Sequence, residues 1–317
     1  MPPRYYVPEL VRPLTRLKYR LLDGRRPFPQ GPKHVQIQTV SGCNGNCIFC
    51  PNQKTAIDIP MGHLMDMDLF KRIIDQVVEI PCLKRISPYL MNEPMLDRLL
   101  PERVKHISDR RPPGVRIKIN SHGNACTETM AKRLLDAGLT HCNFSVQGID
   151  PEAYRQTMGL NFERTVENIE RMVRLRDEGN YRTKINVVML DTTMTHPHLD
   201  AIRAFWRERG ITIHINQLEN RGNSKGIQSD EIAVHALQTY HWCNRLFDQI
   251  YILFDGRLVM CCADWEQTGV LGDANRESIA AIWHGERYRD FRRRFLTGEV
   301  QGMLCDGCTK DGGDDED

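Results

Sequence analysis

The sequence lacks the segments that mark a membrane or secreted protein. No apolar run approaches the roughly 20 residues needed to span a bilayer, and the N-terminus has no apolar stretch of the kind found in signal peptides. An excess of one charge is also missing, because 43 Lys and Arg residues nearly balance 41 Asp and Glu residues. We therefore expect a cytoplasmic protein with no membrane partner, no nucleic-acid partner and a small-molecule or peptide substrate.

The chain has the length of a large domain or of a large and a small one, since it contains 317 residues. Its eleven cysteines do not indicate a disulfide framework, because a reducing compartment keeps thiols free for metal binding or catalysis. The spacing of the cysteines is therefore the most informative feature of the sequence.

A repeated strand–helix pattern begins at His34. Alternating β-rich and helical patterns predict strands and helices in turn. The predicted strands are 34–40, 84–90, 115–120, 142–146, 184–190 and 211–216, and the predicted helices between them include 66–79, 127–137, 162–176 and 198–209. Six such units indicate a parallel sheet with helices outside it, either an open doubly wound sheet or a curved partial barrel.

The pattern changes after about residue 225. Residues 251–254 and 258–260 predict a hairpin around the turn pair Asp255-Gly256, and helical patterns follow at 277–283 and 286–297. We expect a second, smaller unit here. The predicted organisation is an N-terminal extension (1–33), a core (34–224), a small cysteine-rich unit (225–309) and a disordered acidic tail (310–317).

Three cysteines stand within eight residues just after the first predicted strand. Cys43, Cys47 and Cys50 form a C-x3-C-x2-C triplet with an aromatic residue, Phe49, before the last cysteine. Three thiolates suit iron–sulfur or zinc and leave one metal position open for another ligand. A zinc site completed by a residue such as His63 is the structural alternative.

The triplet resembles the signature of the radical S-adenosylmethionine (SAM) superfamily, and the resemblance extends over residues 34–220. It implies a partial (β/α)6 barrel in which the three cysteines hold a [4Fe–4S] cluster that binds and cleaves SAM. Phe49 stands where the aromatic residue of the family contacts SAM. A flavodoxin- or ferredoxin-type protein is the implied reductant.

Further SAM contacts are implied at the ends of the predicted strands. Asn92-Glu93-Pro94 is similar to the family segment that holds the SAM amino group, with Asn92 in place of the usual Gly and Glu93 as the expected contact. Asn120, Ser121 and Ser145 stand where related enzymes contact the methionine and ribose parts of SAM. Strand-end capping is the alternative role for these three residues.

A second set of cysteines lies in the C-terminal part. Cys243, Gly256 and Cys261 follow a C-x12-G-x4-C pattern, and Cys305 and Cys308 form a C-x2-C pair. The set resembles the SPASM/twitch extension of radical SAM enzymes, here a twitch unit whose four cysteines bind one auxiliary [4Fe–4S] cluster. Four ligands fill the four iron corners, which suits electron transfer better than substrate binding. A structural zinc ribbon is the alternative.

The expected reaction is oxidation of a carbinol carbon. The chain resembles the aminocyclitol dehydrogenases of the superfamily, and Arg221 in Asn220-Arg221-Gly222 matches their substrate-binding arginine. Ala263 departs from that family, which has an acid there, and Asp264 could serve as a base. The predicted product is a ketone formed from a sugar, aminocyclitol or aminoglycoside.

Cys262 supports a different outcome, because neither cluster needs this thiol. A thiol at this position resembles the arrangement of aminoglycoside epimerases, in which a cysteine returns a hydrogen atom to the substrate radical; a simply buried cysteine is the alternative. A peptide-modifying radical SAM enzyme and a non-enzymatic zinc-binding protein are the remaining hypotheses.

Overall fold

The structure is a computed structural model that describes residues 31–224, 226–237 and 243–309. Residues 1–30 of the predicted N-terminal extension and the predicted acidic tail lie outside the described residues. Among the residues described, none of the helices combines the length and the hydrophobicity that a membrane span requires.

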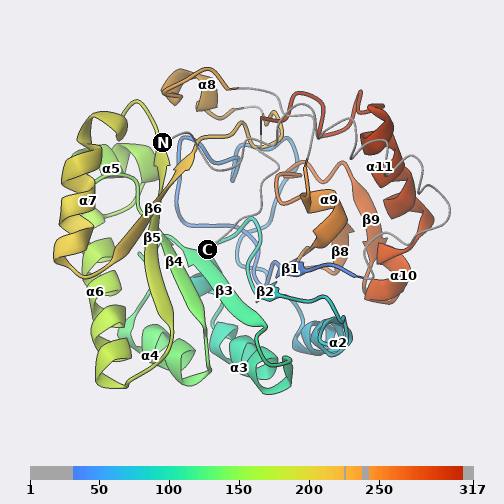
Figure 1. Cartoon of the computed structure of the whole chain (residues 1–317), viewed down its shortest axis with the longest axis horizontal. Coiled ribbons are helices and arrows are strands. Elements are labelled where there is room, and N and C mark those ends of the chain that lie inside the picture. The colour runs from blue at the N-terminus through green and yellow to red at the C-terminus, as the bar shows by residue number, and fades with distance from the viewer. Residues whose placement is uncertain (1–30, 225, 238–242, 310–317) are drawn as a thin grey trace.

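Six strands of the N-terminal part lie side by side in chain order and are all parallel. They are β1 (His34–Ile37), β2 (Arg85–Ser87), β3 (Arg116–Ser121), β4 (His141–Ser145), β5 (Lys184–Asp191) and β6 (Thr212–Gln217). Because the strands are parallel, their carboxyl ends face the same edge of the sheet. The arrangement confirms the predicted partial (β/α)6 barrel, whose sheet curves visibly in Figure 1.

Helices follow most of these strands and lie along the outer side of the sheet in Figure 1. They are α2 (Met67–Val77), α3 (Leu100–Arg110), α4 (Glu128–Asp136), α5 (Pro151–Met158), α6 (Phe162–Glu178) and α7 (Leu199–Glu208), with short 3-10 turns η1 (Pro94–Leu96) and η2 (His196–His198). Polar side chains cap several of the helix starts: Asp66 accepts the Leu69 N–H, Thr127 the Met130 N–H and Asn161 the Arg164 N–H. The predicted helices agree with these bounds, whereas α3 and α5 were not among them.

The two faces of the sheet differ in polarity. Ile37, Ile117 and Ile119 are fully buried in the main hydrophobic core, which the helices complete. Gln36 and Lys118 alternate with these residues and so point to the other, concave face. The barrel therefore has a largely apolar outer wall and a polar interior.

The C-terminal part extends the same sheet. Its elements are α8 (Ser229–Ile232), α9 (Arg245–Asp248), β7 (Gln249–Ile252), β8 (Arg257–Val259), β9 (Val270–Asp273), α10 (Ile279–Trp283) and α11 (Glu286–Thr297). Strand β7 pairs with β1 in parallel, and β8 and β9 continue antiparallel, so the described strands form one nine-stranded sheet. The predicted hairpin is the β7–β8 pair. Its turn needs Gly256, whose φ is +92° and at which a Cβ would lie 2.4 Å from the Asn275 side chain.

Candidate active site

The first cysteine triplet lies on a loop after β1, at the carboxyl edge of the barrel, which we call the cluster loop (residues 42–54). The end of α5 holds this loop, because the Asn46 N–H donates to the Met158 carbonyl at 2.9 Å and the Ile48 N–H to the Thr157 carbonyl at 3.0 Å. Gly159 follows with φ +68°, and a Cβ there would lie 3.2 Å from the Asn46 backbone nitrogen. Backbone contacts with the end of α5 thus help to fix the path of the loop.

The thiols of the cluster loop are in a strongly desolvated environment. Burial raises the pKa of Cys43 to about 12, with a further increase from the negative charge of Glu93. Burial also raises the pKa of Cys47 and of Cys50. Because thiolates are the metal ligands, a bound cation is needed to compensate their charge here.

Groups that favour thiolates also surround the loop. The Gly45 N–H donates to the Cys43 sulfur at 3.3 Å, and the Lys54 ammonium donates to the carbonyl oxygens of Cys47 and Cys50. Hydrogen bonds to cysteine sulfurs and nearby charge are among the factors that tune iron–sulfur clusters. The chemistry of these donors therefore suits a cluster, although no three His, Cys, Asp or Glu side chains of the described residues are grouped closely enough to hold a metal ion.

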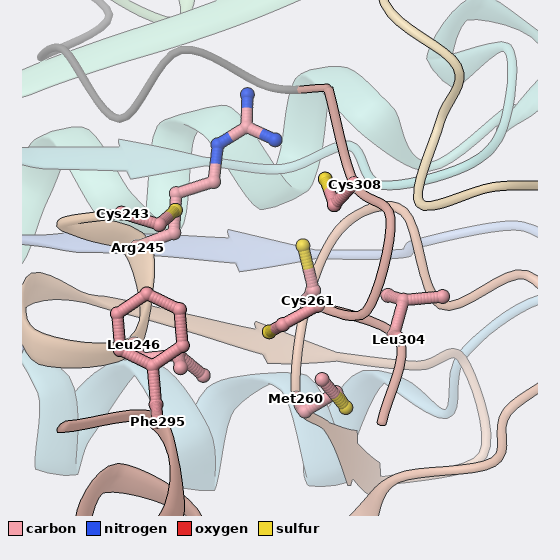
Figure 2. A pocket seen from close by; sticks show the side chains of 9 residues that line it. Cys243, Arg245, Leu246, Met260, Cys261, Phe295, Leu304 and Cys308 are labelled. Atoms are coloured by element: carbon pink, nitrogen blue, oxygen red, sulfur yellow. The ribbon is translucent and has the colours of Figure 1, made fainter. Parts of the chain in front are cut away.

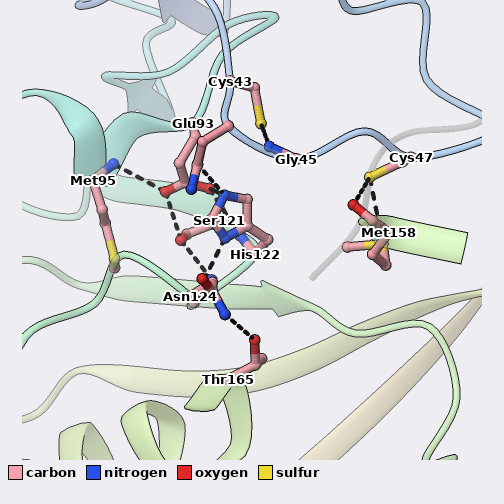
Figure 3. Close-up of polar contacts among 12 residues, drawn as sticks. Cys43, Gly45, Cys47, Glu93, Met95, Ser121, His122, Asn124, Met158 and Thr165 are labelled. Atoms are coloured by element: carbon pink, nitrogen blue, oxygen red, sulfur yellow. Dashed lines mark hydrogen bonds and ion pairs between the residues drawn. The ribbon is translucent and has the colours of Figure 1, made fainter. Parts of the chain in front are cut away.

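Glu93 lies at the centre of a buried hydrogen-bond network beside the cluster loop (Figure 3). Its side chain is nearly inaccessible, with 2% of the residue exposed. One carboxylate oxygen accepts the Met95 N–H at 3.0 Å and the Ser121 hydroxyl at 2.7 Å. The other accepts the His122 N–H at 2.9 Å. The predicted pair Glu93 and Ser121 is thus brought into contact from two strand ends.

His122 links this network to the cluster loop and was missed from the sequence. Its Nδ1 atom lies 3.1 Å from the Asn124 N–H, which donates to it, so the ring proton is on Nε2. That Nε2 is 2.9 Å from the side-chain oxygen of Asn44, the residue next to Cys43, and 3.3 Å from the Glu93 carboxylate. The only sequence signal was a histidine directly after the predicted Ser121.

Two buried amide atoms near the same edge have no hydrogen-bond partner among the residues described: Asn92 Nδ2, a donor, and Asn120 Oδ1, an acceptor. SAM offers partners of both kinds, because it carries a carboxylate, an amino group and ribose hydroxyls. Phe49 is 7% exposed within the main core, and Ser145 is half-buried at the end of β4. The predicted SAM contacts therefore lie at the carboxyl ends of neighbouring strands or on the cluster loop.

The second cysteine set lines one pocket in the C-terminal part (Figure 2). Its sulfur-bearing residues are Cys243, Cys261, Cys305 and Cys308, accompanied by Arg245 and by Leu246, Met260, Phe295 and Leu304. The four predicted ligands, which come from three segments between positions 243 and 308, therefore line one pocket. Cys262 does not line this pocket.

Two cysteines of the second set accept a backbone hydrogen bond of the same kind as the one that Cys43 accepts from Gly45. The Ala263 N–H donates to the Cys261 sulfur at 3.4 Å, and a backbone hydrogen bond from Arg245 reaches Cys243. In each case the donor is two residues after the cysteine, as Gly45 is after Cys43. The geometry assigns Cys261 to the pocket and leaves its neighbour Cys262 outside it.

Arg221 lies within electrostatic range of Cys50, on the cluster loop, and of Cys262. It has φ +50° and its guanidinium donates to Glu219 at 2.9 Å. Burial lowers the pKa of Arg221, but the negative charges of Glu219, Cys50 and Cys262 outweigh that effect and raise it. The predicted substrate-binding arginine is therefore near Cys50, a predicted ligand of the first cluster, and near the Cys262 thiol.

Asp264 lies in a position that favours a structural role over the predicted role as base. It is fully buried. One carboxylate oxygen accepts the Thr268 N–H at 2.9 Å and the Thr268 hydroxyl at 3.0 Å, and the other accepts the Gly269 N–H at 2.9 Å. Both oxygens are thus used to hold the loop between β8 and β9.

A family model described as the radical SAM superfamily matches residues 37–204, more than half of the chain. The chain belongs to the radical SAM superfamily. A second model, SPASM, described as an iron–sulfur cluster-binding domain, matches residues 243–309. The cofactors of this radical SAM protein are SAM, the [4Fe–4S] cluster that binds it and an auxiliary [4Fe–4S] cluster.

Known relatives of this radical SAM protein carry different activities. It is 30% identical over 185 residues to a probable GTP 3′,8-cyclase of Methanococcus maripaludis, covering 58% of each chain. It is 24% identical over 322 residues to the tungsten-containing aldehyde ferredoxin oxidoreductase cofactor-modifying protein of Pyrococcus furiosus, covering 87% of each. Thus the chain spans about three fifths of the length of the first curated relatives.

Among solved structures, BtrN in complex with AdoMet and 2-DOIA has the same fold. The TM-score is 0.61 at 21% identity, and the match covers 88% of this chain and 93% of BtrN. This likeness concerns the fold of both parts, the barrel and the C-terminal unit.

Proposed function

We propose that the protein is a cytoplasmic radical SAM dehydrogenase that oxidises a carbinol carbon of a small polar substrate, of the sugar, aminocyclitol or aminoglycoside type, to a ketone. SAM and its cluster, when bound, supply a 5′-deoxyadenosyl radical after one electron arrives from a flavodoxin- or ferredoxin-type protein. The substrate then loses one hydrogen atom to that radical, one proton to a base and one electron to the auxiliary site.

The observation that carries this proposal is the completeness of the C-terminal pocket. Cys243, Cys261, Cys305 and Cys308 all line it, which is one thiolate for each iron corner of a [4Fe–4S] cluster. A cluster held in this way has no open position for substrate, so it is suited to accepting the electron that the substrate radical releases. The structural match to BtrN covers 88% of this chain, which is consistent with a barrel followed by a cluster-binding unit.

In this proposal, different residues of the chain bind SAM and the substrate. Glu93, held by Ser121 and oriented toward the cluster loop by its contact with His122, would bind the SAM ammonium group. Arg221 would donate to hydroxyl or other acceptor groups of the substrate. Its ion pair with Glu219 leaves further guanidinium donors, because Arg has five N–H groups.

An epimerase is the second candidate, and Cys262 favours it. This thiol is half-buried, lies outside the cluster pocket and acts electrostatically on Arg221. In this alternative the thiol would give a hydrogen atom to the opposite face of the substrate radical, and the substrate would be inverted without net oxidation.

Product analysis in deuterated water separates the two reactions. The reduced protein is incubated anaerobically with SAM and with candidate aminocyclitols, aminoglycosides and sugars, and products are identified by mass spectrometry and NMR. The dehydrogenase proposal predicts a ketone and one 5′-deoxyadenosine for each turnover. Solvent deuterium at one inverted carbon, with no ketone, would replace it with the epimerase.

Variants extend the test to the residues. If the protein is a dehydrogenase, Cys262→Ala should retain ketone formation, while Arg221→Ala should reduce kcat/KM by losing a substrate contact. Cys82→Ala is the matched control, because Cys82 is a half-buried thiol that belongs to neither cysteine set. Loss of all ketone formation in Cys262→Ala alone would contradict the proposed role of the auxiliary site.

A further inference from the structure

A buried arginine belongs to the pocket of the auxiliary cysteines. Arg245 begins α9, only two residues after Cys243, and is 8% exposed. It lines the same pocket as Cys261, Cys305 and Cys308. Figure 2 shows its side chain rising beside Cys243, with the guanidinium on the same side of the pocket as Cys308.

The other described residues that line the pocket, apart from its cysteines, are apolar. Leu246, Met260, Phe295 and Leu304 complete it, and Figure 2 places Leu246, Phe295 and Met260 on the side away from the guanidinium. A charge in such apolar surroundings is poorly screened, so its Coulomb interaction with a nearby cluster is stronger than in water. Arg245 is therefore the cation in the described lining of the pocket, while the buried carboxylate of Asp264 acts electrostatically on Cys305.

Reduction of a cluster adds one negative charge to a site that already carries four thiolates. A neighbouring cation stabilises the reduced state more than the oxidised state and so raises the reduction potential. The Arg245 backbone N–H also donates to Cys243, and Gln or Lys at this position keeps that N–H group. Side-chain variants therefore test the effect of the guanidinium charge on the reduction potential separately from the effect of the backbone hydrogen bond.

We propose that Arg245 tunes the auxiliary cluster for electron acceptance: its buried guanidinium raises the reduction potential of the cluster held by the four pocket cysteines. The consequence for catalysis rests on the proposed dehydrogenase function, in which the substrate radical is oxidised by one electron and the auxiliary cluster is reduced by that electron. The potential itself does not depend on the substrate.

The test uses the full-length protein, reconstituted anaerobically with both clusters. Midpoint potentials are measured without substrate by redox titration followed by electron paramagnetic resonance, for the wild type, Arg245→Gln and Arg245→Lys. Iron and sulfide per chain are measured in the same samples. Arg209→Gln, which removes an arginine paired with Glu170 at the end of α7, is the control for a lost cation elsewhere.

The expected result is a lower auxiliary potential in Arg245→Gln, a potential close to wild type in Arg245→Lys, and no shift in Arg209→Gln. The SAM-binding cluster of the same molecule should shift less. Unchanged auxiliary potentials in Arg245→Gln with full iron content would overturn the proposal, as would equal decreases in the Gln and Lys variants, which would indicate a packing effect.

If Arg245→Gln loses the auxiliary iron, its auxiliary potential cannot be measured, and Arg245→Lys decides. A wild-type potential in Arg245→Lys supports the proposal, and a lowered potential overturns it. Product analysis then distinguishes this inference from the proposed function. A dehydrogenase should form ketone more slowly in Arg245→Gln, whereas an epimerase would show the shifted potential with no ketone in any variant.

Discussion

Replacement of Glu93 by Gln tests the centre of the proposed SAM site with almost no change in shape. The carboxylate accepts three protein hydrogen bonds, from Met95, Ser121 and His122. An amide has only one oxygen, so in either orientation its NH2 group meets a backbone N–H that needs an acceptor. An unsatisfied buried donor costs about 1–3 kcal/mol, which is the expected loss in the free energy of unfolding.

The effect on SAM is separate from this loss of stability. A hydrogen bond to a charged group contributes about 1.5–3 kcal/mol, and about 1.4 kcal/mol corresponds to a tenfold change in affinity. If Glu93 binds the SAM ammonium group, Glu93→Gln should therefore raise the dissociation constant of SAM by roughly 10-fold to 150-fold. The SAM-binding cluster itself should still assemble, because its three cysteines are unchanged.

Equilibrium dialysis of reconstituted protein with labelled SAM measures the dissociation constant, and thermal unfolding and iron analysis are performed on the same samples. Glu102→Gln is the matched control, because Glu102 is exposed and pairs with Arg133 on the surface. It should leave SAM binding unchanged and stability within about 1 kcal/mol. An unaltered SAM dissociation constant in a fully loaded Glu93→Gln protein would refute the assignment of Glu93.

Three further predictions concern the cysteines and the C-terminal loop. Replacement of all three cluster-loop cysteines by Ala should lower iron from about eight to about four per chain and abolish SAM cleavage, since seven ligands imply two clusters; continued cleavage would disprove the site. Replacement of Cys305 and Cys308 by Ala should remove the auxiliary iron and lower Tm, because metal binding and folding are coupled; zinc instead of iron in protein isolated without oxygen would remove the electron-acceptor role. Asp264→Asn should cost about 1–3 kcal/mol of stability with normal ketone formation per folded molecule, and a stable but inactive variant would restore Asp264 as the base.

Local sequence patterns predicted the elements of the fold closely. The alternation of apolar and polar residues predicted the strand at 184–190, which the structure has at Lys184–Asp191, and the helix at 286–297 has the bounds Glu286–Thr297. Such patterns indicate which face of a helix or strand is buried, and a few neighbouring residues are enough to show it. They do not determine which strands become neighbours, so the parallel pairing of β7 with β1 was not foreseen.

The sequence by itself determined the superfamily, because the spacing of Cys43, Cys47 and Cys50 on one short loop carries its signature. That these three cysteines hold the first cluster stays a prediction. The spacing of Cys243, Gly256 and Cys261 already favoured Cys261 over its neighbour Cys262, and the tertiary structure added that Cys261 lines the same pocket as Cys243, Cys305 and Cys308. Only the tertiary structure showed that both carboxylate oxygens of Asp264 accept hydrogen bonds from Thr268 and Gly269. The link from Asn44 through His122 to Glu93 likewise joins three separate segments, and such contacts exist only once the strands are placed side by side.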